Sequence, residues 1–211
     1  MTLAHSTPPR TDHPVVTLTE TVEGLYAIRE PRCGAAIWQR APRPGFQDWI
    51  DGLDPAQLPR ARLVLRPAAV AGALATLCDA SGMPEGPARQ WFEADVTALT
   101  TRFAALMRAE YLRLRLDVIT TNACSKFHMD AILARLVCSY RGTGTQLGPT
   151  TDGTDPETVT TLAPCSPVVL RGALWPPQGE AHVLHRSPPI AGTGETRLVL
   201  VLDPVYDLED A

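Results

Sequence analysis

The sequence predicts an α+β fold in which a helical N-terminal part precedes an antiparallel sandwich or barrel. Helical periodicity is concentrated before residue 110, and from residue 111 onward apolar runs typical of strands alternate with glycine-containing turns. Helices and strands do not alternate one by one, which disfavours a parallel sheet. A chain of 211 residues is long enough for one well-buried core. We therefore expect a single domain over residues 21–211, behind a proline-containing mobile leader over residues 1–20.

Residues 21–110 are expected to be mainly helical, with short strands at Gly24–Ile28 and Ala35–Trp38. The expected helices are Phe46–Leu53, Pro67–Cys78 and Pro87–Arg108. The last two begin with proline, which suits the first turn of a helix because its missing N–H needs no partner there. The third helix has apolar residues at steps of three and four, as in a helix with one face on a core.

Residues 111–203 are expected to form the β core. Leu112–Val118 alternates apolar and charged residues, as a half-buried strand does. The other expected strands are Leu136–Tyr140, Ser166–Arg171, Ala181–Arg186 and Thr196–Asp203. The last of these is almost continuously aliphatic, which predicts burial on both faces.

Composition and charge narrow the possible functions. A net charge of −4 argues against a general nucleic-acid surface. There is no run of apolar residues long enough for a membrane span, and the N-terminus lacks the basic start and apolar middle of a secretory signal. The five cysteines include no Cys-x-x-Cys pair, which disfavours a disulfide scaffold and a zinc ribbon. We expect a cytoplasmic protein.

A candidate metal site begins at His128-Met129-Asp130. In an extended strand, residues two apart point to the same face, so this imidazole and this carboxylate can reach one ion. His185 lies downstream and is the candidate third ligand. Two histidines and one carboxylate on one face of a metal, with open positions opposite, is the arrangement of non-haem Fe(II) oxygenases.

The same strand could present a fourth ligand. If the chain runs straight from Cys124 to Asp130, Cys124 lies on the same face, and a thiolate would favour zinc over iron. The alternative is a thiol that packs beside the site. Iron and zinc therefore both remain open at this point.

Four further residues are candidates near the site. The Tyr140 hydroxyl could donate to a bound acid, with a core tyrosine as the alternative. Asn122, Lys126 and Arg141 are candidates for the rim of a substrate pocket. A turn-capping role for Asn122 and a solvated charge for Lys126 are the alternatives.

The order of these residues resembles the Fe(II)/2-oxoglutarate-dependent oxygenases over residues 111–203. The shared pattern is His-x-Asp, a distal His and then an Arg, here Arg197. The resemblance implies a double-stranded β-helix, also called a jelly-roll or cupin-like fold, under the helical N-terminal layer. It further implies iron ligands His128, Asp130 and His185, with 2-oxoglutarate as a small-molecule co-substrate held by Arg197. The chain departs from the family at Val199, where a Ser or Thr is frequent.

A second resemblance covers most of residues 21–203. The segments Thr120–Asp130, Tyr140–Thr145, His185–Pro189 and Gly194–Arg197 are similar to the bacterial DUF1826 family, a domain of unknown function. This resemblance implies no particular activity, but it implies a link to metal homeostasis. The expected function is thus a metal-dependent oxygenase with an unknown substrate. The alternatives are a non-catalytic or zinc-binding cupin-like protein, and a metal-free scaffold that acts through a partner surface. The sequence does not define the oligomeric state.

Overall fold

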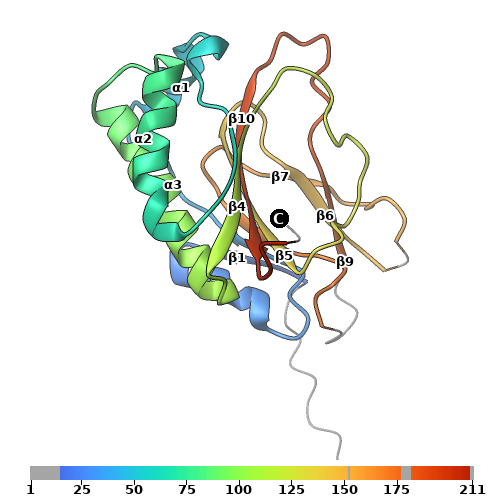
Figure 1. Cartoon of the computed structure of the whole chain (residues 1–211). Coiled ribbons are helices and arrows are strands. Elements are labelled where there is room, and N and C mark those ends of the chain that lie inside the picture. Colours follow the sequence, from blue (N-terminus) through green and yellow to red (C-terminus); the bar gives the residue numbers. More distant parts are fainter. Residues whose placement is uncertain (1–14, 152, 177–181, 210–211) are drawn as a thin grey trace, which may run out of the picture.

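The computed structural model of the protein describes residues 15–151, 153–176 and 182–209. Two β-sheets face each other, and a layer of helices covers the outer face of the larger sheet (Figure 1). The larger sheet has the order β1-β2-β8-β5-β10-β4-β3, and the smaller sheet has the order β7-β6-β9. Every pairing is antiparallel except that of β1 with β2. The strands are β1 (Val16–Thr19), β2 (Ala35–Trp38), β3 (Ala61–Leu65), β4 (Tyr111–Ile119), β5 (Ala134–Arg141), β6 (Gln146–Thr150), β7 (Thr160–Thr161), β8 (Val168–Arg171), β9 (His182–Arg186) and β10 (Arg197–Val205).

The central strand β10 separates two apolar cores. Leu198, Leu200 and Leu202 pack toward the helices, whereas Val199 and Val201 pack toward the small sheet. Side chains alternate between the faces of a strand, so each core receives every second residue. The predicted burial of this strand on both faces is confirmed. The α+β class and the predicted sandwich of antiparallel sheets are also confirmed.

The helical layer follows the sequence closely. It comprises α1 (Phe46–Gly52), α2 (Val70–Ser81), which follows a 3-10 turn over Pro67–Ala69, and α3 (Pro87–Met107). Gly82 ends α2 in a left-handed conformation with φ of 70°, which glycine adopts without a steric penalty. Within the described ranges, no helix is both long and apolar enough to cross a membrane.

Two expectations for the N-terminal region are wrong. Val16–Thr19 lies inside the expected leader but forms β1, because it finds a pairing partner in β2; residues 1–14 lie outside the described part. The expected strand at Gly24–Ile28 is instead a 3-10 helix over Val22–Arg29. Its buried residues, Leu25 and Ile28, are three apart, and that spacing puts both on one face of a 3-10 helix but on opposite faces of a strand.

Besides β1, three further strands of the described residues were not predicted from the sequence. The edge strand β3 carries exposed side chains at its three central positions, so it lacks an apolar alternation. The other two, β6 and β7, belong to the small sheet. Since β1, β2 and β3 all join the large sheet, the β core is not confined to residues 111–203.

Tyr140 lies on the helical side of β5, so its expected role at the binding site is wrong. Its ring packs edge-on against Phe92, and its hydroxyl donates to Asp95 Oδ2 at 2.6 Å. Arg40 donates to both oxygens of the same carboxylate, at 2.5 and 2.6 Å. Burial, reinforced by the negative charge of Asp95, raises the pKa of Tyr140 well above its ordinary value. Tyr140 therefore belongs to a buried network in the helical core.

Replacing Tyr140 with Phe should lower the free energy of unfolding by about 1–3 kcal/mol, because a buried carboxylate loses a donor. Urea denaturation measures the change. The matched control is Tyr206→Phe, which removes a hydroxyl that donates to the Met107 carbonyl from a position 56% exposed. That control should cost less than about 0.5 kcal/mol. If both variants lose the same free energy of unfolding, the Asp95 network does not stabilise the fold as proposed.

Candidate metal centre

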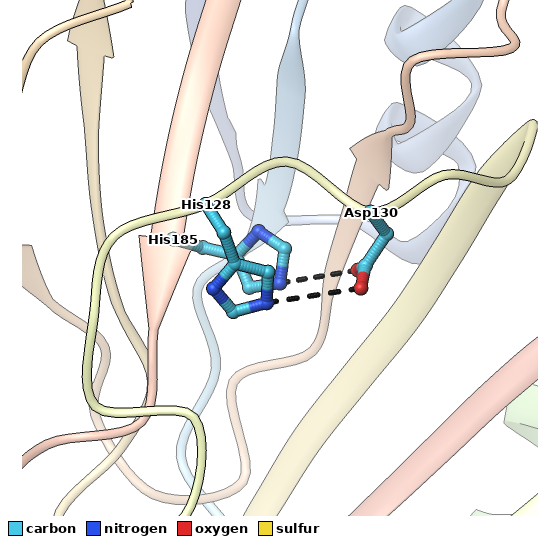
Figure 2. Close-up of side chains that lie close together, drawn as sticks. All are labelled: His128, Asp130 and His185. Atoms are coloured by element: carbon cyan, nitrogen blue, oxygen red, sulfur yellow. Dashed lines mark ion pairs between the residues drawn. The ribbon is translucent and has the colours of Figure 1, made fainter.

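The side chains of His128, Asp130 and His185 point toward one another (Figure 2). Their potential ligand atoms all lie within 4.8 Å of one another. His185 Nε2 is 3.2 Å from Asp130 Oδ2, and His128 Nε2 is 3.8 Å from Asp130 Oδ1. The structure therefore brings together all three ligands that the sequence predicts.

The two histidines are joined through their backbones. The N–H of His128 donates to the carbonyl of His185 at 3.0 Å, and the N–H of His185 donates to the carbonyl of His128 at 3.0 Å. This exchange makes them a directly opposed antiparallel pair, whose side chains share one face. The imidazole centroids are accordingly 4.6 Å apart.

The expected straight strand from Cys124 to Asp130 is wrong. Only His128 makes a strand-like bridge in this segment, and Cys124 has a left-handed φ of 48°. The thiol of Cys124 is exposed and does not join the group of three ligands. Sequence alternation therefore did not define the face that Cys124 presents.

The ring of His128 is oriented by the backbone. Its Nδ1 lies 2.9 Å from the Lys126 carbonyl, which can only accept a hydrogen bond. A hydrogen bond to this carbonyl uses Nδ1, which leaves Nε2 as the ring nitrogen that faces Asp130 and His185. A carbonyl that fixes the tautomer in this way is a frequent support for a histidine that binds metal.

Asp130 is held by a neighbour that the sequence analysis did not identify. Arg135 Nη1 donates to Asp130 Oδ1 at 2.6 Å, and the same guanidinium grips Asp203 through Nε and Nη2 at 2.6 and 2.9 Å. Asp130 Oδ2 is buried and accepts no well-aligned hydrogen bond. Burial by itself would raise the pKa of Asp130, but the adjacent His185 and the charge of Arg135 outweigh it and lower that pKa. The carboxylate is thus kept ionised with one oxygen available as a ligand.

Arg197 is buried at the start of β10 and is 1% exposed. Its Nε donates to the Thr143 carbonyl at 2.6 Å, and its Nη2 donates to Ser139 Oγ at 3.2 Å. Its Nη1 is buried and has no partner among the described residues. Burial lowers the pKa of Arg197 to about 10, and the charge of Glu195 offsets this only in part. The guanidinium is still protonated near neutral pH, so the site carries an incompletely matched positive charge.

A cavity of about 110 Å³ lies beside the two histidines. His128 and His185 line it, and so does Val199, which is two residues from Arg197 on the same face of β10. A ligand in this space would therefore contact the candidate metal site beside the strand that carries Arg197.

A family model described as protein of unknown function (DUF1826) matches residues 19–203. The chain belongs to the DUF1826 family. No curated protein matches it.

Solved oxygenase structures are similar to this DUF1826 protein. The dioxygenase for auxin oxidation 1 of Arabidopsis thaliana, in complex with 2-oxoglutarate, matches with a TM-score of 0.52 and 11% identity over 92% of this chain and 93% of that chain. The rice dioxygenase for auxin oxidation matches with a TM-score of 0.49 and 16% identity over 92% of this chain and 84% of that chain. A 2OG-Fe(II) oxygenase family member from Burkholderia pseudomallei matches with a TM-score of 0.43 and 17% identity over 89% of this chain and 94% of that chain. The first similarity shows the fold, and the predicted double-stranded β-helix is confirmed.

The predicted rim residues of the DUF1826 protein have structural contacts. The side chain of Asn122 accepts hydrogen bonds from the backbone N–H groups of Ile190 and Ala191, both at 2.8 Å. Lys126 is exposed and acts on the site through its carbonyl. Arg141 Nη1 donates to the Leu53 carbonyl at 2.8 Å, beside the helical layer. Asn122 and Arg141 therefore support loops, and neither lines the cavity beside the two histidines.

The close packing of Gly172 fixes the backbone that follows His128. A Cβ at Gly172 would lie 2.0 Å from the Ile132 carbonyl oxygen and 2.8 Å from that of Asp130. The next residue, Ala173, donates its N–H to the Asp130 carbonyl at 2.8 Å. The residues that follow β8 thereby fix the position of the Asp130 backbone.

Arg135→Lys should weaken binding of a divalent metal by about 10–100-fold, the usual cost of losing a group that orients a ligand. Lysine keeps the charge but cannot hold Asp130 and Asp203 with one rigid fork. Calorimetric titration with Co²⁺ measures the affinity, and cobalt absorption reports the geometry.

The matched control for this prediction is Arg40→Lys, which alters another buried Arg–Asp pair on the helical side of the sheet. It should reduce stability but leave Co²⁺ affinity unchanged. If both variants bind Co²⁺ like the parent, the assigned role of Arg135 is wrong.

Proposed function

We propose that the protein is an Fe(II)- and 2-oxoglutarate-dependent oxygenase acting on a small-molecule substrate. The observation that carries the proposal is that one barrel interior holds two histidines and one carboxylate together with a buried guanidinium that has an unmatched donor. The first set fits Fe(II), and the second fits a carboxylate of the co-substrate. Fold similarity to a dioxygenase bound to 2-oxoglutarate supports the pairing.

The residues of the chain have separate tasks in this function. His128, Asp130 and His185 would hold Fe(II) through one atom each and leave the opposite positions open. Arg197 would hold the distal carboxylate of 2-oxoglutarate, and apolar residues such as Val137 and Val199 would exclude water from the cavity. With both groups bound, the chemistry supplied is oxidation of a substrate C–H bond by O₂, coupled to decarboxylation of the co-substrate.

The alternative is a closed zinc site in a protein of metal homeostasis, and it needs Cys124 as the fourth ligand. The Cys124 carbonyl accepts a hydrogen bond from the Ser187 N–H at 3.1 Å, and its thiol lies outside the three-ligand group. A set of three protein ligands favours a site that retains open positions. The iron-dependent function is therefore the better supported.

Arg197→Gln should weaken 2-oxoglutarate binding to the Fe(II)-loaded protein by about 30-fold or more, since truncating a buried charged partner costs about 2–5 kcal/mol. Anaerobic calorimetry measures this affinity, and Fe(II) affinity should stay unchanged. Arg102→Gln is the matched control, because Arg102 is 49% exposed on α3.

Two outcomes would count against the proposal. Equal 2-oxoglutarate affinity in Arg197→Gln and the parent would remove the co-substrate anchor. Stoichiometric zinc that is lost on Cys124→Ala would establish the closed site instead.

A further inference from the structure

Arg115 on β4 is, like Arg197, a guanidinium with a buried donor that lacks a partner among the described residues. It lines the same cavity as His128 and His185. Its Nε is buried and has no partner among the described residues. An arginine has five N–H donors, and leaving a buried donor unmatched costs free energy. A ligand with a hydrogen-bond acceptor beside Arg115 would remove this cost.

The nearby carboxylates do not satisfy Arg115. Its Nη2 is 3.7 Å from Asp203 Oδ2, and that carboxylate already accepts two hydrogen bonds from Arg135. Its Nη1 is 4.0 Å from Asp117 Oδ2, whose side chain is 42% exposed. Both separations exceed hydrogen-bond length. The two carboxylates therefore attract the guanidinium electrostatically but accept no hydrogen bond from it.

Arg115 is distinct from the candidate co-substrate anchor. Across β10 it pairs with Val201, whereas Arg197 pairs with Ile119, so the two arginines are four strand positions apart. At about 3.4 Å per residue this is roughly 14 Å along the sheet. Through Asp203 and Arg135, Arg115 lies close to Asp130. The two cationic groups therefore serve different parts of the cavity.

Four apolar side chains line the cavity between these arginines, namely Ile119, Val137, Val199 and Val201, together with the carboxylate of Asp117. A further cation, Arg186, also lines the cavity and packs over the Phe127 ring at 4.4 Å. Its Nε donates to the neutral Gln146 at 2.8 Å. The lining thus combines a short apolar surface with three guanidinium groups, of which Arg115 has a buried donor without a partner among the described residues.

We propose that the substrate is a small apolar carboxylic acid whose carboxylate binds Arg115. The inference rests on the proposed oxygenase function and adds the substrate class. A guanidinium holds a carboxylate through two parallel hydrogen bonds, which would use the donors that the protein leaves unmatched. The apolar body would then lie along the valines, beside the three metal ligands.

The test uses butyrate, benzoate and phenylacetate, each compared with its amide. They are titrated by anaerobic calorimetry into protein loaded with Fe(II) and 2-oxoglutarate. At least one acid should bind about tenfold or more tightly than its amide, because only the acid gives charge-assisted hydrogen bonds. Arg115→Gln should abolish this preference, Arg115→Lys should retain part of it, and Arg102→Gln should leave it unchanged.

The outcomes separate the two proposals. No preference for any acid, or a preference that survives in Arg115→Gln, overturns the substrate class. Loss of 2-oxoglutarate binding in Arg115→Gln, with normal binding in Arg197→Gln, would make Arg115 the co-substrate anchor and overturn the inference. Failure of the parent protein to bind 2-oxoglutarate counts against the oxygenase, while acid binding to the metal-loaded protein would still test Arg115.

Discussion

The candidate site depends on one pair of backbone hydrogen bonds, those exchanged by His128 and His185. Residues on either side of His128 form no strand, so these bonds tie an irregular segment to β9. A directly opposed antiparallel pair places both side chains on the same face. Because β9 is also paired with β6, the position of His185 is set by the small sheet, and that of His128 follows from it. The geometry of two ligands is thus a property of the backbone.

The position of the third ligand, Asp130, is fixed by an ion pair with Arg135. Asp130 enters from the large-sheet side, where the end of β8 supports its backbone and Arg135 takes one carboxylate oxygen. Arg135 is held in turn by Asp203 of β10, which is 3% exposed. Buried charges need partners of good geometry, and a single guanidinium can serve two carboxylates only if both are fixed. The site therefore joins the two sheets: histidines from the small-sheet side and a carboxylate clamped to the large sheet.

The sequence was informative where a residue type and a periodicity coincide. The three helices, the strand at Arg197–Val205 and the ligands His128, Asp130 and His185 were all predictable. Tyr140 and Arg141 were not, because β5 is buried on both faces and a register shift between Leu198 and Val199 occurs opposite them. Such a bulge turns successive side chains toward one face, and alternation along the chain cannot reveal it. Arg135 was missed for a related reason, since a charged residue in a strand ordinarily indicates a solvent face.

Arg197 and Arg115 each have one buried guanidinium donor without a partner among the described residues. Placing an ion in an apolar interior costs several kcal/mol unless an opposite charge accompanies it. Arg197 remains protonated while its Nη1 lacks a partner, so the fold itself bears part of that cost. A carboxylate bound at Arg197 would reduce this free-energy cost. The apolar surroundings that make the buried charge unfavourable also strengthen the attraction between the guanidinium and a carboxylate. The same reasoning applies less strongly to Arg115, which is 21% exposed. A bound carboxylate would therefore draw binding free energy from guanidinium donors that the polypeptide leaves unmatched.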